Sequence, residues 1–158
     1  MKAAVIFGSR SDAGVMKKAA EVFKEFGVEY GSFVLSAHRS PELLEETIAE
    51  LEKDGTEVIV AGAGLAAHLP GVIASRTALP VIGVPIASGT LGGMDALLSM
   101  AQMPKPMPVA VVGVDNAANA AYLGVEILAL KYPELRTKLE AFRAKMKAGL
   151  AGDSRIEL

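Results

Sequence analysis

The chain has 158 residues, of which 51% are apolar and 22% are charged, and its formal net charge is −2. This size and composition are typical of one compact domain over residues 1–158, and the slightly acidic balance excludes a strongly basic, nucleic-acid-binding surface. The absence of cysteine excludes disulfides and thiolate zinc sites, and it is consistent with a cytoplasmic protein.

Two further features of the composition concern assembly and location. A mean hydropathy of +0.37 is high for a monomer, so we expect a homo-oligomer that hides apolar surface. The apolar stretch at the N-terminus is broken at Gly8. It is too short for a signal peptide or a membrane span, so we expect neither export nor a membrane partner.

Apolar runs predict five β-strands. Four of them are rich in valine and isoleucine and lack alternation, which is typical of strands covered on both faces. These four runs occupy residues 3–7, 58–62, 80–86 and 108–114, and a weaker run occupies residues 29–36.

Helical patterns alternate with these runs. The clearest begins with Ser40 as N-cap and Pro41 at the first helical position, and it ends at Gly55. The other predicted helices run from Asp12 to Gly27, follow residues 66–71, cover residues 94–103, run from 116 towards 131, and run from 133 to about 147.

We expect residues 148–158 to form a tail or a subunit-contacting arm. Alternation of strand and helix predicts an α/β fold with a doubly wound, parallel five-stranded sheet and a C-terminal helix.

Unusual loops follow four of the predicted strands, at the sheet edge where such folds bind ligands. They read GSRSD (8–12), SAHRSP (36–41), AGAGLAAHLPG (61–71) and PIASGTLGGMD (85–95). The first could hold an anion at a helix N-terminus, or it could be a plain turn in which Asp12 caps the helix. It matches neither a Walker loop nor GxGxxG.

The only two histidines, His38 and His68, fall in the second and third of these loops. Each loop alone could be a solvated turn, but two histidines at one sheet edge favour a functional site. Arg39 beside His38 suits an anionic group. Two histidines without HExxH spacing disfavour a metal site, and the lack of GxSxG disfavours a serine hydrolase.

The order of these loops along the chain is also informative. Together with PVIGVP, LLSMAQMP and NAANAAYLG, their order and spacing over residues 3–130 resemble the bacterial N5-carboxyaminoimidazole ribonucleotide mutase family, also called the catalytic subunit of phosphoribosylaminoimidazole carboxylase. The resemblance implies a three-layer flavodoxin-like sandwich that forms a homo-octamer with active sites at subunit boundaries. It implies an isomerase of purine biosynthesis that needs no metal or organic cofactor. Such an enzyme moves a carboxylate from N5 to C4 of a ribonucleotide substrate by releasing and recapturing CO2.

The resemblance also implies roles for individual residues. His68 would be the general acid and base. Matching positions place nucleotide contacts at Ser9, Ser11, Asp12, Ser36 and Arg39, while Ala37 and His38 shape the same pocket. Gly64, Ala66, Ala67 and Leu69 would form a small apolar chamber for CO2.

Two residues depart from the family pattern. Ala13 stands where a tryptophan is frequent, and Leu65 replaces a glycine, which requires a backbone shift if that glycine had a positive φ. Three alternatives therefore stay open: a carboxylase that uses free CO2, a non-catalytic nucleotide-binding module, and a scaffold of the same fold. Arg39 and His68 favour the mutase over the carboxylase, whose relatives typically carry lysine after the histidine of the second loop.

Overall fold

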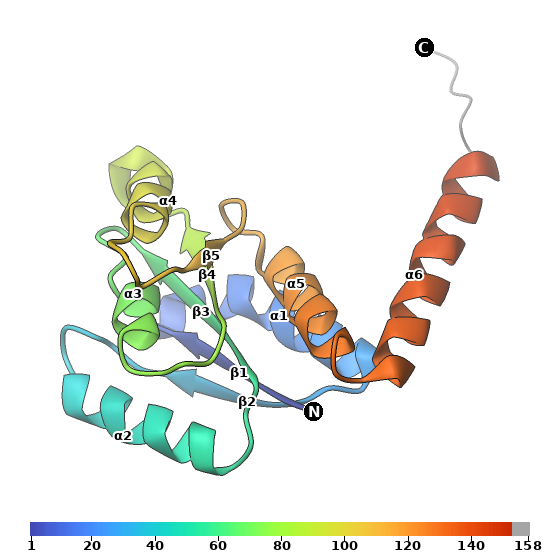
Figure 1. Cartoon of the computed structure of the whole chain (residues 1–158). Coiled ribbons are helices and arrows are strands. Elements are labelled where there is room, and N and C mark those ends of the chain that lie inside the picture. The colour runs from blue at the N-terminus through green and yellow to red at the C-terminus, as the bar shows by residue number, and fades with distance from the viewer. Residues whose placement is uncertain (153–158) are drawn as a thin grey trace.

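A parallel five-stranded sheet in the order β2-β1-β3-β4-β5 forms the centre of the molecule (Figure 1). The computed structural model describes residues 1–152. The strands are β1 (Lys2–Phe7), β2 (Glu29–Val34), β3 (Val58–Gly64), β4 (Val81–Ile86) and β5 (Ala110–Val111). The strand order reverses between β1 and β3, which confirms the predicted doubly wound topology.

Helices cover both faces of this sheet (Figure 1). One face carries α1 (Ala13–Phe26), α5 (Ala117–Ala129) and α6 (Pro133–Gly152), and the other carries α2 (Pro41–Lys53), α3 (Leu69–Ala74) and α4 (Met94–Ala101). Short 3-10 turns, η1 (Arg10–Asp12) and η2 (Gly89–Leu91), precede α1 and α4. Alternate residues of β1 enter different cores, with Val5 beneath α1 and Ile6 beneath α2, so the predicted three-layer sandwich is confirmed.

Three element boundaries differ most from the prediction. β5 is shorter than the run at 108–114, because Pro108 has no N–H to donate to β4. Past the strand, the amides of Val112 and Asp115 still donate to the Gly83 and Pro85 carbonyls of β4, at 3.1 Å and 2.8 Å. α3 starts at Leu69, inside the AAHLPG motif, because Pro70 is tolerated in a first helical turn.

The third difference concerns the C-terminal segment. α6 continues to Gly152, through positions predicted to belong to the tail, and it projects from the body of the molecule (Figure 1). Residues 153–158, the rest of that predicted tail, lie outside the described residues. Within residues 1–152, no helix combines the length and apolar character needed to cross a membrane.

Glu57 joins the start of β3 to the turn between α5 and α6. Its carboxylate accepts hydrogen bonds from Lys131 Nζ at 2.6 Å and from the Tyr132 hydroxyl at 2.7 Å, and the N-terminal amine lies 3.9 Å away. Burial opposes ionisation, but the bonds from Lys131 and Tyr132 outweigh it and lower the pKa of Glu57 below its ordinary value of 4.5. The contact thus stabilises the folded state only while Glu57 is ionised.

We predict that Glu57→Gln lowers the free energy of unfolding by about 1 kcal/mol at neutral pH, because two charge-assisted bonds weaken. A lowered folded pKa means that the stabilisation is present above pH 4.5 and is lost as the pH falls through the folded value. Urea unfolding at several pH values should show the two proteins converging in acid. Glu140→Gln removes an exposed helical ion pair with Arg136 and should have little effect. A constant difference down to low pH would contradict this account.

Candidate functional site

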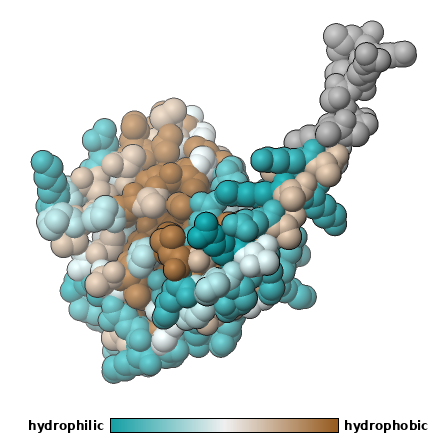
Figure 2. Space-filling model, turned by 45° about the vertical axis from the view of Figure 1, so that its right-hand side comes forward, coloured by the Kyte–Doolittle hydropathy of each residue, from teal (hydrophilic) through white to brown (hydrophobic). Residues whose placement is uncertain are grey.

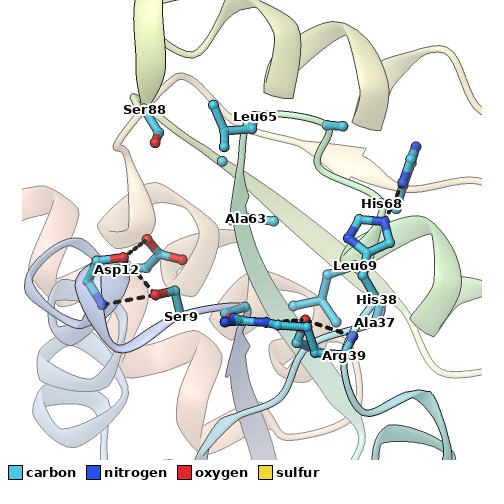
Figure 3. A pocket seen from close by; sticks show the side chains of 15 residues that line it. Ser9, Asp12, Ala37, His38, Arg39, Ala63, Leu65, His68, Leu69 and Ser88 are labelled. Carbon is cyan, nitrogen blue, oxygen red and sulfur yellow. Dashed lines mark hydrogen bonds between the residues drawn. The ribbon is translucent and has the colours of Figure 1, made fainter.

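A pocket of about 440 Å³ lies at the carboxyl ends of β1 to β4, beside the point where the strand order reverses (Figure 3). Its walls come from the loops that follow these four strands, as the strand-end motifs predicted. The lining residues are Gly8, Ser9, Ser11, Asp12, Ser36, Ala37, His38, Arg39, Ala63, Gly64, Leu65, Ala66, His68, Leu69 and Ser88.

The sequence-predicted site residues meet in this pocket, with one exception. Ala67 does not line it, because its side chain is 2% exposed and packs in the core beneath α2 and α3. Ser88 was missed as a site residue, although it lies in the unusual loop after β4. Ala13, the first residue of α1, is exposed and is not among the lining residues.

Arg39 links the first two loops across the floor of the pocket. Its Nη2 donates to the Gly8 carbonyl at 2.9 Å, and its Nε donates to Ser36 Oγ at 3.2 Å. The Ser40 hydroxyl donates to the Ser36 carbonyl at 3.2 Å, so Ser40 braces the loop and makes no side-chain cap on α2. No carboxylate among the described side chains pairs with Arg39. Its remaining N–H groups can therefore bind an anion.

Hydroxyls of the first loop lie on the same side of the pocket as Asp12 (Figure 3). Ser11 Oγ is 2.8 Å from Ser9 Oγ and 3.0 Å from Asp12 Oδ1, and Ser9 Oγ also accepts from the Ser11 amide. Asp12 stands at the N-cap of α1 but makes no capping bond. Asp12 thus occupies the expected N-cap position without a side-chain capping bond, and its carboxylate can accept hydrogen bonds from a ligand hydroxyl.

The two histidines contact each other at the other side of the pocket. His38 Nε2 and His68 Nδ1 are 2.7 Å apart, and the rings meet edge to face with centroids 4.9 Å apart. One nitrogen must donate and the other accept, so the bonded pair can hold one extra proton but not two. His38 Nδ1 and His68 Nε2 are left for other partners. The pair can thus exchange a proton with a bound ligand.

Leu65 has a left-handed backbone, with φ of 54°. The glycine-like conformation considered from the sequence is therefore present, and a leucine occupies it at a cost of about 1 kcal/mol. The side chain is 53% exposed and lies against Gly89, where an added Cβ would be 2.7 Å from Leu65 Cδ2. Gly64 permits a similarly close approach, because a Cβ there would be 2.9 Å from the Cβ of Ser88.

We predict that Leu65→Gly raises the free energy of unfolding by up to about 1 kcal/mol, because relief of the left-handed strain outweighs the added freedom of the unfolded chain. Ala66→Gly, at a neighbouring position without a positive φ, should instead destabilise the protein by about 0.5–1 kcal/mol. Thermal or urea unfolding of both variants measures the two effects. A loss of stability in Leu65→Gly would show that position 65 is not strained.

Among residues 1–149, no three histidine, aspartate or glutamate side chains gather in a way that could hold a metal ion.

Comparison with known proteins gives the site a context. The model of the AIR carboxylase family matches residues 2–149. The N5-carboxyaminoimidazole ribonucleotide mutase of Pyrococcus abyssi is 56% identical over 92% of this chain and 84% of its own, and that of Saccharolobus solfataricus is 53% identical over 92% of each chain. A crystal structure of Treponema denticola PurE is 26% identical and superposes with a TM-score of 0.88 over 99% of both chains. These similarities extend over the whole sheet and all the loops of the pocket.

Proposed function

The chain belongs to the AIR carboxylase family, and from this premise we propose that it is an N5-carboxyaminoimidazole ribonucleotide mutase, an isomerase of purine biosynthesis. The observation that carries the proposal is one pocket that holds a hydrogen-bonded histidine pair together with an arginine free of any described carboxylate partner. The pair can move a proton, and the arginine can hold a phosphate.

The nucleotide lies across the pocket between these two groups. Its phosphate binds the free N–H groups of Arg39 and the hydroxyls of Ser9 and Ser36, and the ribose hydroxyls donate to Asp12. The aminoimidazole ring then reaches towards the histidine pair, beside Ala37 and Ala63. This orientation places the charged phosphate at the guanidinium and the reacting ring at the histidine pair.

The reaction needs a proton at one atom and releases one at another. The N-carboxylate loses CO2 when its nitrogen gains a proton, and the ring carbon C4 then forms a bond to CO2 and loses its own proton. The overall change consumes no electrons and no net proton, so the proposal includes no cofactor. One group that donates a proton to the nitrogen as an acid, and then accepts the C4 proton as a base, can serve both halves.

In this proposal the two histidines transfer the proton together. The family resemblance implies this role for His68 alone, but His38 Nε2 lies 2.7 Å from His68 Nδ1, and His38 also lines the pocket. One ring exchanges a proton with the substrate, and the other buffers that proton through the shared hydrogen bond. Gly64, Ala66 and Leu69 supply the small apolar wall beside CO2, without the buried Ala67.

A carboxylase that takes CO2 directly from solution remains the second candidate, since the family description names that activity. The same pocket suits it, because the second half of the mutase reaction is this carboxylation. An ultraviolet assay separates the candidates by supplying the N-carboxylated substrate, or the uncarboxylated ribonucleotide with bicarbonate, or neither. Product from the first alone identifies a mutase, product from the second at a comparable rate identifies a carboxylase, and no product identifies a scaffold.

The proposal extends to assembly and location. We place the enzyme in the cytoplasm as a homo-octamer with pockets at subunit boundaries. Exposed apolar side chains support burial against other subunits, among them Leu91 at 63%, Met94 at 54% and Leu98 at 51%. Figure 2 shows a continuous apolar area on the face beside the projecting α6.

We predict that His38→Asn and His68→Asn each lower kcat, and that the variant of the ring that meets the substrate loses about 10²–10⁴-fold. Asparagine keeps a hydrogen-bonding group but cannot carry the proton. Steady-state assays with the N-carboxylated substrate measure the loss, and sedimentation checks that the assembly is unchanged. Wild-type turnover in both variants would remove the pair from the mechanism.

We predict that Arg39→Ala raises KM about 10–100-fold with a smaller effect on kcat, because the guanidinium binds the phosphate in substrate and transition state alike. Arg10→Ala is the matched control, since Arg10 is in the same part of the structure but does not line the pocket. Isothermal titration with the product nucleotide measures binding directly. A large loss of kcat at unchanged KM would contradict phosphate binding by Arg39.

A further inference from the structure

Leu65 is the one large apolar side chain that the β3–α3 loop presents at the rim of the pocket. Figure 3 shows it across the pocket from Arg39, between Ser88 and His68. Its immediate neighbours in the loop, Gly64 and Ala66, also line the pocket but carry no side chain or a single methyl group. Leu65 is therefore the largest apolar side chain that this loop adds to the lining, and it lies on the side of the pocket nearer Ser88 (Figure 3).

The backbone conformation of Leu65 and its contact with Gly89 together define where its side chain lies. The left-handed backbone, with φ of 54°, directs it away from the extended path of β3. Its Cδ2 then lies so close to Gly89 that a Cβ there would be 2.7 Å away. Leu65 thus reaches from the β3–α3 loop to the turn that follows β4, so it connects two of the four loops around the pocket.

This arrangement is energetically unfavourable for folding alone. A leucine in this backbone region is strained, and half of its apolar surface stays in contact with water. Strained residues of this kind concentrate at functional sites, where the conformation serves the ligand. The feature that glycine could not supply here is an apolar side chain facing the ligand.

We propose that Leu65 is an apolar cover that retains CO2 in the pocket between its release from nitrogen and its capture by carbon. The inference rests on the proposed mutase function. CO2 offers no hydrogen-bond donor and can leave as soon as a path to solvent opens. A branched apolar side chain across that path keeps water out and favours recapture over escape.

The test measures how often CO2 exchanges with solvent during one turnover. The full chain converts unlabelled N-carboxylated substrate in buffer that contains 13C-labelled bicarbonate, and mass spectrometry gives the labelled fraction of the C-carboxylated product, extrapolated to zero time. We expect a low fraction for the wild type. We expect a fraction about 3–10-fold higher for Leu65→Gly and Leu65→Asn, and little change for Leu65→Met.

These substitutions separate the cover from backbone strain. Asparagine is similar in size to leucine and tolerates the left-handed region, so Leu65→Asn removes the strain and the apolar character together. Methionine keeps the apolar character and the strain. Leu43→Asn is the control, because Leu43 on α2 is 52% exposed, close to the 53% of Leu65, and lies outside the pocket.

Three outcomes would overturn the inference: an unchanged labelled fraction in Leu65→Asn, an equal rise in Leu43→Asn, or a change in the assembly of Leu65→Asn on sedimentation, which would make Leu65 a subunit contact.

A failure of the proposed mutase function would give a different result. If the wild type forms no C-carboxylated product from the N-carboxylated substrate, the mutase proposal fails. If the wild type turns over and only the label does not respond, the mutase stands and the cover is wrong.

Discussion

The structure depends on the parallel pairing of β3 with both β1 and β4. Parallel strands end at the same edge of a sheet, so three consecutive strand-end loops must meet there. β3 is buried along nearly its whole length, and the small residues near its end let the neighbouring strands and loops approach closely. Gly62 is in contact range of Met16 and Ile86, and Gly64 is close to Ser88. The position of the pocket therefore follows from the sheet, which brings its loops together.

Two kinds of chemistry are separated within this pocket. The first two loops gather hydroxyls, one carboxylate and the guanidinium of Arg39, which suit a sugar phosphate. The histidine pair and the small apolar residues after β3 form the other end, which handles a proton and an uncharged gas in the proposed reaction. In that reaction the nucleotide is held by parts that do not react, and the reacting atoms lie in apolar surroundings.

Particular residues show what could be predicted from the sequence. The buried runs of β1, β3 and β4 and the start of α2 at Ser40 and Pro41 were predicted because each signal is local. The short β5 and the extension of α6 were not, because pairing at a sheet edge and helix length depend on tertiary contacts. Both histidines could be assigned to one edge, but the hydrogen bond between them could not, since strand order fixes where a loop lies and not where its side chains point. The replacement of a glycine by Leu65 raised the question of whether this position has a positive φ, and the structure shows that it does.

The contacts of Arg39 with the Gly8 carbonyl and the Ser36 hydroxyl have a consequence for ligand affinity. A long, flexible side chain ordinarily loses rotational freedom when it closes on its ligand, and this loss weakens association. Here two contacts within the chain orient the guanidinium, so part of that entropy is lost when the chain folds. The pocket is thereby preorganised, so a nucleotide phosphate bound to Arg39 as proposed loses less affinity to the ordering of that side chain.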